Sequence, residues 1–544
     1  MKKMIIAIAV ISCLSSCTQV AGWFGSNEDS TRLESPDSIE VYRDVSINES
    51  NAYSDLFLDS SAIESFIKSE GLKDSAAKLF RDFYTVRNGQ YAWFASGGPT
   101  EQARGLWGLY SNQAEAGKDK GDDSLRKRMD SLLADSTALI ADSSVLLSTE
   151  LALTRQLIDL ALTQPEGAIN RSTIFYLVPA KRQDAMQLAD SLLNRQKDSS
   201  AYASNKLYQM MKTQLALYYD LARNGGWAAI TGPVNASKGS RQPQVKAIKK
   251  RLQATREYDA ADTTDIFSDS LQSAIRRYQE RNGLQASGMI NDSLLSSLNV
   301  SAEDRLKQIL VNMNRILWSQ PTTDSSYLQV NIPSFMLYAF ENGRPSLQMP
   351  VIVGKEGANT MMFSGNINKV VFSPYWNIPE SIVRNEIMPA MKKDPGYLKK
   401  HNMERTGGSD SLPVLRQLPG KDNALGKVKF LFPNSFDIYL HDTPNKSLFA
   451  RNDRALSHGC IRVADATRLA QYILQDEASW TPEKISAAMN ANKEQTVEIR
   501  NTHPVHITYL TAWVDDQGFM NFRPDVYGHD GEAMTRMFVA AAGR

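Results

Sequence analysis

Residues 440–463 read LHDTPNKSLFARNDRALSHGCIRV and contain His441 and, further along, Cys460. His441 follows an alternating apolar segment, 436–440, so we expect it where a β-strand ends. Cys460 precedes a second strand-like segment, and two neighbouring strand ends would bring the imidazole and the thiol together. Because an imidazole lowers the pKa of an adjacent thiol and can carry its proton, this pair predicts a cysteine nucleophile with a histidine base.

The residues around Cys460 fit the same chemistry. Gly459 has no Cβ, so unusual backbone angles and the close approach of a substrate carbonyl are possible there. We expect the amides of Gly459 and Cys460 to face the oxyanion that develops when a carbonyl is attacked. Arg462 lies two positions beyond the thiol on the same strand face, where it would hold a substrate carboxylate through a bidentate contact. The alternative is an arginine in a surface salt bridge.

A metal site and a structural cysteine are the alternative interpretations of this stretch. His441, His458 and Cys460 could supply the nitrogen and sulfur ligands of a catalytic zinc site. However, the stretch lacks a second cysteine, and neither an HExxH nor a CxxC motif occurs in the chain. We therefore expect neither a metal nor an organic cofactor. A buried structural cysteine between two unrelated histidines is the least favoured interpretation.

The length and charge of the chain limit its organisation and its partners. A chain of 544 residues exceeds one hydrophobic core, so we expect two to four domains. Hydrophobic residues make up 42% of the sequence, which is enough for several cores. Lys and Arg number 61 and Asp and Glu 60, which argues against binding nucleic acid or an anionic membrane through overall charge.

The N-terminus has the layout of a secretory signal, with two lysines, an apolar run over 4–14 and small residues before Cys17. It resembles a bacterial lipoprotein signal, which implies a lipoprotein signal over 1–17 and lipidation of Cys17. The alternative is an ordinary signal with a coincidental cysteine. Cys460 would then be the lone free thiol, without a disulfide partner. Residues 18–51 are rich in Ser, Asp, Glu and Asn and predict a flexible tether.

The next parts of the chain predict helices. Residues 52–235 carry apolar residues three and four positions apart, which indicates a helical scaffold domain. Residues 239–300 predict a module of three short helices and resemble the peptidoglycan-binding-like domain of cell-wall enzymes, with a Gly283-Leu284 step and a turn at Gly288. Residues 301–325 contain an amphipathic connecting helix. The apolar positions expected to face the core of the module are Val245, Ile248, Leu252, Leu271, Ile275 and Tyr278.

From residue 326 the apolar period changes to two, so 326–530 predict a mostly β catalytic domain. A turn at Asn342-Gly343 separates the first strands. Residues 379–426 are polar and too long for a simple connection, which predicts a lid, with a disordered excursion as the alternative. Residues 531–544 form a C-terminal tail. The predicted fold class is multidomain α+β.

The residues of the histidine and cysteine stretch resemble a known family. A histidine followed, after a spacer, by Ser457, His458, Gly459 and Cys460 resembles the signature of the L,D-transpeptidases, the YkuD fold. The large YcbB-type branch, which combines a helical scaffold, a peptidoglycan-binding-like module and the catalytic domain, is similar over most of the chain. The segments that carry this wider likeness are VNIPSFMLYAF, VIVGK, SPYWNIPESI and YLTAWVDDQG.

The resemblance assigns roles to individual positions. It implies that Cys460 is the nucleophile and that His441 is the base, oriented by the backbone carbonyl of Asp442. His458 and Gly459 take the motif places beside the nucleophile. The other positions implied to contact the substrate are Arg462, Tyr439, Tyr375, Trp376 and Asn377.

The resemblance also implies an activity. The family forms 3-3 cross-links in peptidoglycan from tetrapeptide stems through a cysteine thioester, without a metal or organic cofactor. The implied partners are stem peptides and glycan strands, and the implied location is the periplasmic side of the cell envelope, with a lipid anchor at Cys17 in either the inner or the outer membrane. Two alternatives stay open: an L,D-carboxypeptidase that hydrolyses the same bond, and a non-catalytic lipoprotein that binds the cell wall.

Overall fold

The computed structural model describes residues 41–115, 123–134, 143–163, 169–171, 173–194, 205–232, 234, 236–258, 261–318 and 326–539. The predicted signal with Cys17 and most of the predicted tether lie outside these ranges. Within them, none of the helices combines the length and the apolar character that a membrane crossing requires.

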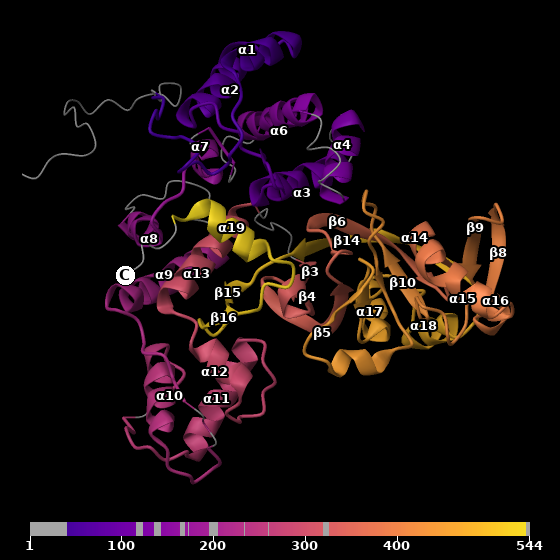
Figure 1. Cartoon of the computed structure of the whole chain (residues 1–544). Coiled ribbons are helices and arrows are strands. Elements are labelled where there is room, and N and C mark those ends of the chain that lie inside the picture. The colour runs from indigo at the N-terminus through magenta and orange to yellow at the C-terminus, as the bar shows by residue number, and fades with distance from the viewer. Residues whose placement is uncertain are drawn as a thin grey trace, which may run out of the picture. The chain divides into compact units, whose positions relative to one another are not determined.

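Helices dominate the described part of 52–235 (Figure 1). Their core contains Phe83 and Tyr84 near the end of α2 and Trp93 shortly after it, so this aromatic-rich segment packs helices together. Asn88 and Gly89 form a turn after α2, both with positive φ. The elements are α1 (Ser60–Ser69), α2 (Asp74–Val86), β1 (Phe94–Ala95), β2 (Gly98–Pro99), α3 (Glu101–Glu115), α4 (Asp123–Ala134), α6 (Ser143–Thr163), α7 (Ile174–Leu177), α8 (Ala185–Asn194) and α9 (Lys206–Arg223).

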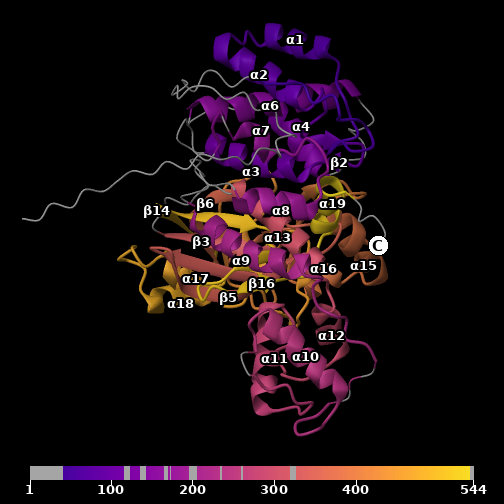
Figure 2. The same ribbon diagram turned by 90° about the vertical axis from the view of Figure 1, so that its left-hand side faces the viewer.

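The small helical module has a core of its own. It consists of α10 (Pro243–Ala254), α11 (Asp269–Arg281) and α12 (Asp292–Leu298), which lie together in Figure 2. Ser268 begins α11 by accepting a hydrogen bond from the amide of Leu271. The predicted apolar faces are confirmed, because the six side chains expected there are all buried in one cluster: Val245, Ile248, Leu252, Leu271, Ile275 and Tyr278.

The predicted connecting helix is α13 (Ala302–Leu317), which buries apolar side chains in the same core as the N-terminal helices. Its Arg315 is buried between two carboxylates. The guanidinium lies 2.8 Å from Glu101 on α3 and 2.5 Å from Asp530 on α19 (His529–Met537). This ion-pair network therefore joins α3 and α13 to α19, a helix that includes the first residues of the predicted C-terminal tail.

The catalytic domain predicted from residue 326 is built on one large sheet, in the order β12-β5-β13-β11-β10-β6-β14-β3-β4. Because β5 also pairs with β4, the sheet closes on itself, and its apolar side chains fill the interior with those of α17 and α18. The elements are β3 (Ser326–Asn331), β4 (Met336–Glu341), β5 (Arg344–Gly354), β6 (Phe363–Phe372), β10 (Val428–Leu431), β11 (Leu440–His441), β12 (Ala455–Ser457), β13 (Ile461–Val463), α17 (Ala466–Ile473), α18 (Pro482–Met489), β14 (Gln495–Thr508) and the hairpin β15 (Ala512–Val514) and β16 (Met520–Phe522).

The segment predicted to be a lid is folded. It has its own small core, which includes Ile378, Val383 and Leu415, so the disordered alternative is wrong. Figure 1 shows its helices and strands grouped at one end of the domain. The elements are β7 (Trp376–Asn377), α14 (Glu380–Ile382), a π-helical turn (Val383–Ile387), α15 (Met388–Lys393), α16 (Tyr397–Lys400), β8 (Met403–Gly408) and β9 (Pro413–Gln417).

One predicted strand is shorter than expected. Residues 436–440 alternate in hydrophobicity, yet β11 begins only at Leu440. Asp437 adopts a left-handed φ of 53°, and the side chain of Asn434 accepts hydrogen bonds from the amides of Phe436 and Ile438. This local loop takes up the backbone groups that a strand would pair.

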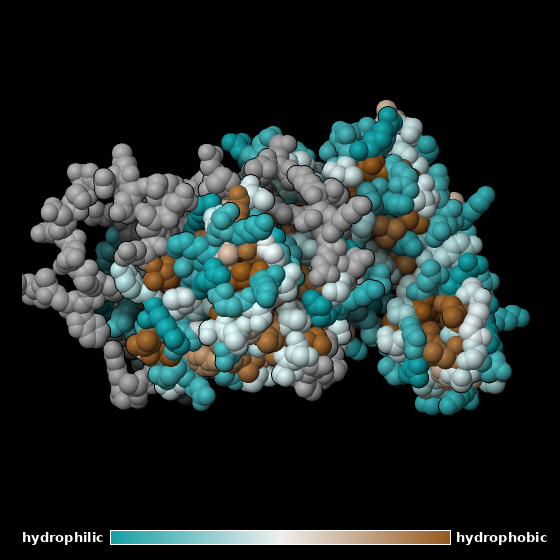
Figure 3. Space-filling model, turned by 90° about the horizontal axis from the view of Figure 1, so that it is seen from above, coloured by the Kyte–Doolittle hydropathy of each residue, from teal (hydrophilic) through white to brown (hydrophobic). Residues whose placement is uncertain are grey.

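The multidomain α+β class is confirmed: helices precede and follow the small module, and a mostly β domain comes after them. On the face drawn in Figure 3, the described hydrophobic residues appear as separate patches among hydrophilic ones. This pattern is expected when each part buries its apolar side chains in its own core.

Candidate active site

His441 ends β11 (Leu440–His441), and Cys460 immediately precedes the neighbouring parallel strand β13 (Ile461–Val463). In the pairing of β11 with β13, Leu440 is opposite Ile461, and the amide of Ile461 donates to the carbonyl of Tyr439 at 3.1 Å. Leu440 and Ile461 are fully buried in the interior of the domain. Because side chains alternate along a strand, His441 and Cys460 project from the opposite, outer face of the sheet.

The imidazole of His441 is held by the residue that follows it. Its Nδ1 lies 2.5 Å from the carbonyl oxygen of Asp442. Since a carbonyl can only accept, Nδ1 carries the hydrogen and Nε2 is left as the acceptor that a general base needs. The carboxylate of Asp442 is itself fixed, by Lys446 at 2.6 Å and by the amide of Lys427 at 2.9 Å.

The surroundings of the pair keep both groups neutral at pH 7. Burial and the positive charge of Arg462 lower the pKa of His441 to about 3. Burial raises the pKa of the Cys460 thiol, against the opposing effects of hydrogen bonds from Tyr439 and of Arg462. The net shift in the pKa of Cys460 is therefore upward, opposite to the direction expected for a thiol beside an imidazole.

The thiol and the imidazole are close in the sheet without being hydrogen-bonded to each other. Among the described residues, the hydrogen-bond acceptor of the thiol is the carbonyl oxygen of Asp437, at 3.6 Å. The ring of Tyr439 lies 5.7 Å from that of His441 and also contacts the thiol. Proton transfer thus requires the thiol to turn from the Asp437 carbonyl toward Nε2.

The loop before the thiol is fixed by Thr360. The buried Thr360 hydroxyl donates to the carbonyl of Gly459 at 2.6 Å and accepts from the amide of Gly354 at 2.9 Å. Gly459 has a φ of 114°, which a residue with a Cβ rarely adopts. Its amide donates to the hydroxyl of Ser457 at 3.2 Å, so the expectation that this amide is an open oxyanion donor is wrong. The amide of Cys460 is left as the backbone candidate for that role.

His458 contacts the insertion. Its Nε2 lies 2.9 Å from a carboxylate oxygen of Glu386, on the π-helical turn of the insertion. Among the described residues, no three His, Cys, Asp or Glu side chains are grouped as metal ligands. The motif histidine therefore joins the insertion to the loop that bears Cys460.

The guanidinium of Arg462 lies beside the catalytic pair. Its Nε is buried and has no hydrogen-bond partner among the described residues. The guanidinium as a whole forms no ion pair with a described residue. A surface salt bridge, the alternative considered for this arginine, is thus not formed in the described part of the chain. The arrangement brings together a thiol, an imidazole with a fixed tautomer and a guanidinium with an unused N–H donor.

Three segments of the chain match known domain families. Residues 325–506 match the YkuD family, described as "L,D-transpeptidase catalytic domain". The chain carries a YkuD L,D-transpeptidase catalytic domain. Residues 78–215 match a family described as "Scaffold domain", and residues 241–298 match the "Putative peptidoglycan binding domain".

Individual proteins are also similar to this chain. A Haemophilus influenzae protein named "Putative L,D-transpeptidase" is 37% identical over 217 residues, which are 37% of this chain and 44% of that protein. The match thus spans less than half of that relative. Two solved structures are each 16% identical: an L,D-transpeptidase from Stackebrandtia nassauensis (51% of this chain, 96% of that chain, TM-score 0.22) and L,D-transpeptidase 3 from Mycobacterium tuberculosis with a faropenem-derived adduct (34% and 60%, TM-score 0.19).

The aromatic positions predicted near the YkuD site divide into two groups. Tyr439 contacts the thiol, as described above. Tyr375 lies at the start of the insertion, with its ring 4.4 Å from the guanidinium of Arg416. Trp376 and Asn377 form β7, which pairs with β9 of the insertion, and Trp376 packs against the core of the insertion. The structure therefore places these two in the insertion, and their contact with the substrate stays a prediction.

Two residues of the YkuD domain escaped the sequence analysis. Thr360 is a buried threonine whose role depends on a distant loop, and Lys429 pairs directly with His441 across β10 and β11. The alternation of Val428, Lys429 and Phe430 does indicate that Lys429 faces outward. Which strand lies beside it could not be read from the spacing.

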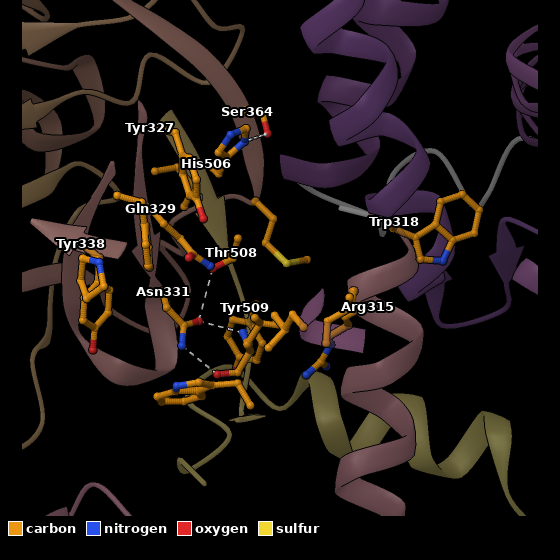
Figure 4. Close-up of a pocket in the computed structure, with 18 of the residues that line it drawn as sticks. Arg315, Trp318, Tyr327, Gln329, Asn331, Tyr338, Ser364, His506, Thr508 and Tyr509 are labelled. Atoms are coloured by element: carbon orange, nitrogen blue, oxygen red, sulfur yellow. Dashed lines mark hydrogen bonds between the residues drawn. The ribbon is translucent and has the colours of Figure 1, made fainter. Parts of the chain in front are cut away.

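A large cavity lies elsewhere on the YkuD sheet, against the helical region (Figure 4). It measures about 1080 Å³, and neither Cys460 nor His441 lines it. Figure 4 shows Gln329 and Asn331 on the same strand, β3; Gln329 bonds Thr508, and Asn331 bonds the backbone of Leu510. These polar groups are hydrogen-bonded to other protein groups, and the cavity is separate from the thiol.

Proposed function

We propose that this protein is a murein L,D-transpeptidase that forms 3-3 cross-links in peptidoglycan, with Cys460 as nucleophile and His441 as base. The observation that carries the proposal is that His441 ends β11 while Cys460 immediately precedes the adjacent parallel strand β13, with the tautomer of His441 fixed by the carbonyl of Asp442. The match of residues 325–506 to the YkuD family supports the reaction class.

The first half-reaction releases D-alanine. Cys460 Sγ bonds to the carbonyl carbon between the L-centre of the stem's diamino acid and the terminal D-alanine, while the thiol proton passes to His441 Nε2. The carbonyl electron pair becomes an oxyanion, which the amide of Cys460 stabilises. When the carbonyl re-forms, the C–N bond breaks and His441 returns the proton to the leaving amine. A thioester remains on Cys460.

The second half-reaction transfers the acyl group. The side-chain amine of another stem attacks the thioester carbon and gives a proton to His441. The C–S bond then breaks, the new amide forms, and the sulfur regains its proton. Because the pKa of the thiol is raised and that of His441 is lowered, the resting pair is a thiol and a neutral imidazole. His441 must therefore remove the proton during attack and does not keep a standing thiolate.

The other parts of the chain fit this role. The small helical module, whose residues 241–298 match a peptidoglycan-binding family, would hold glycan strands near the catalytic domain. We place the protein on the periplasmic side of the cell envelope, with a lipid anchor at Cys17. Arg462, with its unpartnered buried Nε, would bind the carboxylate of the terminal D-alanine.

Purified protein and defined tetrapeptide stems test the proposal. Mass spectrometry should detect a cross-linked dimer, released D-alanine and a covalent adduct with a carbapenem, and Cys460→Ala should abolish all three. His441→Gln should slow both acylations by about 100-fold or more. Turnover by Cys460→Ala would remove the cysteine from its role, and a hydrolysed tripeptide as the sole product would show a carboxypeptidase instead. Thermal unfolding of each variant serves as the folding control.

A further inference from the structure

Lys429 lies next to His441 on the outer face of the sheet. Lys429 on β10 is paired with His441 on β11, and His441 is paired with Arg462 on β13. Each of these three residues has a core residue beside it in the chain: Phe430 follows Lys429, Leu440 precedes His441 and Ile461 precedes Arg462. The three side chains therefore form a row on one face, with a cation on each side of the base.

The ammonium of Lys429 has little to bind within the protein. Among the described residues its hydrogen bond is to the carbonyl of Tyr375, at 3.5 Å, and no carboxylate lies within ion-pair distance. Burial lowers the pKa of Lys429, and the charge of Glu494 only opposes this. By contrast, the buried Lys249 has a carboxylate of its own, Asp262, at 2.5 Å.

An ammonium can donate three hydrogen bonds, and a half-buried one without an anionic partner is costly. Nothing in the described fold explains this cost at Lys429, whereas a carboxylate supplied by the substrate would. The position is fixed on a central strand of a rigid sheet, where such a contact can be held precisely.

The two cations lie at different distances from the thiol. With a rise of about 3.3 Å per residue and a strand spacing of about 4.8 Å, the Cα of Arg462 is about 7 Å from that of Cys460, and that of Lys429 about 12 Å. In a tetrapeptide donor, the D-alanine carboxylate is two bonds from the scissile nitrogen. A carboxylate at the second centre of a dicarboxylic diamino acid is separated from the scissile carbonyl by five carbons. The nearer carboxylate fits Arg462 and the farther one fits Lys429.

We infer that Lys429 binds the carboxylate at the second centre of the donor's diamino acid, and that the protein selects stems in which this carboxylate is free. This inference rests on the proposed function and narrows its substrate to stems with a dicarboxylic diamino acid such as diaminopimelate. Lys429 is a positioning and specificity residue, since it does not touch the reacting atoms.

The test uses two diaminopimelate tetrapeptides that differ only in the second-centre group, a free carboxylate or its amide. The wild-type protein should release D-alanine from the free acid with a kcat/KM about 10- to 100-fold higher than from the amide, mainly through KM. In Lys429→Met this ratio should fall toward one, and Lys429→Arg should restore part of it. In a Cys460→Ala background, calorimetry should show the same loss of affinity for the free acid.

Lys369→Met is the matched control. Lys369 lies on the neighbouring strand β6 and pairs with Glu498 at 2.9 Å, so its removal should leave the ratio unchanged. An unchanged ratio in Lys429→Met, or in Lys429→Gln if the first variant does not fold, would overturn the inference. So would equal rates for the two donors in the wild type.

A third donor separates the two carboxylates. This donor carries an amide at the terminal D-alanine, and Lys429→Met should still discriminate against it as the wild type does. Loss of that discrimination in Lys429→Met would assign Lys429 to the terminal carboxylate and overturn the inference. If the wild-type protein releases no D-alanine from any donor, the proposed function fails and this inference with it. If the wild-type protein is active and Lys429→Met keeps the wild-type ratio between the free-acid and amide donors, the role of Lys429 is rejected while the proposed function stands.

Discussion

Gly426 lies against the side chain of Asp442, so close that a Cβ atom at position 426 would collide with the Asp442 carboxylate. Gly426 also has a positive φ of 62°. Since the carbonyl of Asp442 orients His441, Gly426→Ala should disturb the base as well as the fold. We expect a loss of about 2–4 kcal/mol in unfolding free energy, from backbone strain plus the clash, and a carbapenem acylation rate at least tenfold lower.

Gly343→Ala separates the two effects. Gly343 has a similar φ of 73°, but a Cβ there meets no atom within 4 Å. This variant should lose only about 1–2 kcal/mol, the cost of the left-handed backbone, and should acylate at the wild-type rate. Equal acylation rates in the two variants, measured by mass spectrometry on folded protein, would contradict a role for Gly426 in holding Asp442 and His441.

The low pKa of His441 predicts the pH dependence of the reaction. With a pKa of about 3, the imidazole stays neutral through the mildly acidic range, so carbapenem acylation should show no acid limb near pH 6.5. Arg462→Gln removes a cation that lowers this pKa and should move any acid limb upward. A wild-type limb centred near pH 6.5, from rates measured between pH 4 and 8, would contradict the neutral pair.

The same residue links stability to pH. In the unfolded chain His441 has an ordinary pKa of about 6.5, so between pH 3 and 6.5 the unfolded state binds a proton that the folded state does not. The contribution of His441 is therefore complete above pH 6.5 and is lost progressively as the pH falls toward 3. Denaturant unfolding at several pH values should show that the unfolding free energy of His441→Gln changes less with pH over this window than that of the wild type. Parallel slopes would contradict the burial of a neutral His441.

Local patterns in the sequence predicted the elements well, because they report which face of a helix or strand is buried. The strands expected from residue 326 and the turn at Asn342-Gly343 are both found in the structure, and so is the core of the small module. The nearness of His441 and Cys460 could be expected since each adjoins a short strand. What alternation cannot give is the register between strands, which is set by the whole sheet.

The parts that were missed depend on this long-range register or on the protein interior. Lys429 becomes the neighbour of His441 only through the pairing of β10 with β11. The contacts of Thr360 with Gly459 join loops almost a hundred residues apart. The pKa of Cys460 is raised because of burial, which a spacing argument does not measure, so the expected direction was wrong.

Thr360 should be required for the shape of the motif loop. Thr360→Val keeps the volume but removes the hydroxyl, which leaves the Gly459 carbonyl and the Gly354 amide without their partner. We expect a loss of about 1–3 kcal/mol in unfolding free energy and acylation about 10- to 100-fold slower, because the thiol is misplaced. Thr360→Ser keeps the hydroxyl and should stay close to the wild type. If Thr360→Ser and Thr360→Val acylate at one rate, the hydroxyl does not position the loop.

The contact between His458 and Glu386 should hold the insertion near the motif. Both side chains are partly exposed, so Glu386→Gln should change the unfolding free energy by less than about 1 kcal/mol. Hydrogen exchange at 383–387 and at 457–460 should nevertheless become faster, since the contact between His458 and Glu386 joins these segments. Glu380→Gln is the control, because Glu380 pairs with Arg384 inside the insertion. The same exchange pattern in both variants would show that the contact to His458 has no such effect.

The buried Arg315 should be the most sensitive charged residue in the helical region. Arg315→Met leaves the carboxylates of Glu101 and Asp530 buried together without their cation, which should cost about 3–5 kcal/mol of unfolding free energy. Replacing both acids as well, with Gln and Asn, should recover part of this loss, because no buried charge is then left unpaired. Arg223→Met removes an exposed pair with Asp220 and should cost less than about 1 kcal/mol. If denaturant unfolding gave similar losses for the two arginine variants, the network would not be what ties α3, α13 and α19 together.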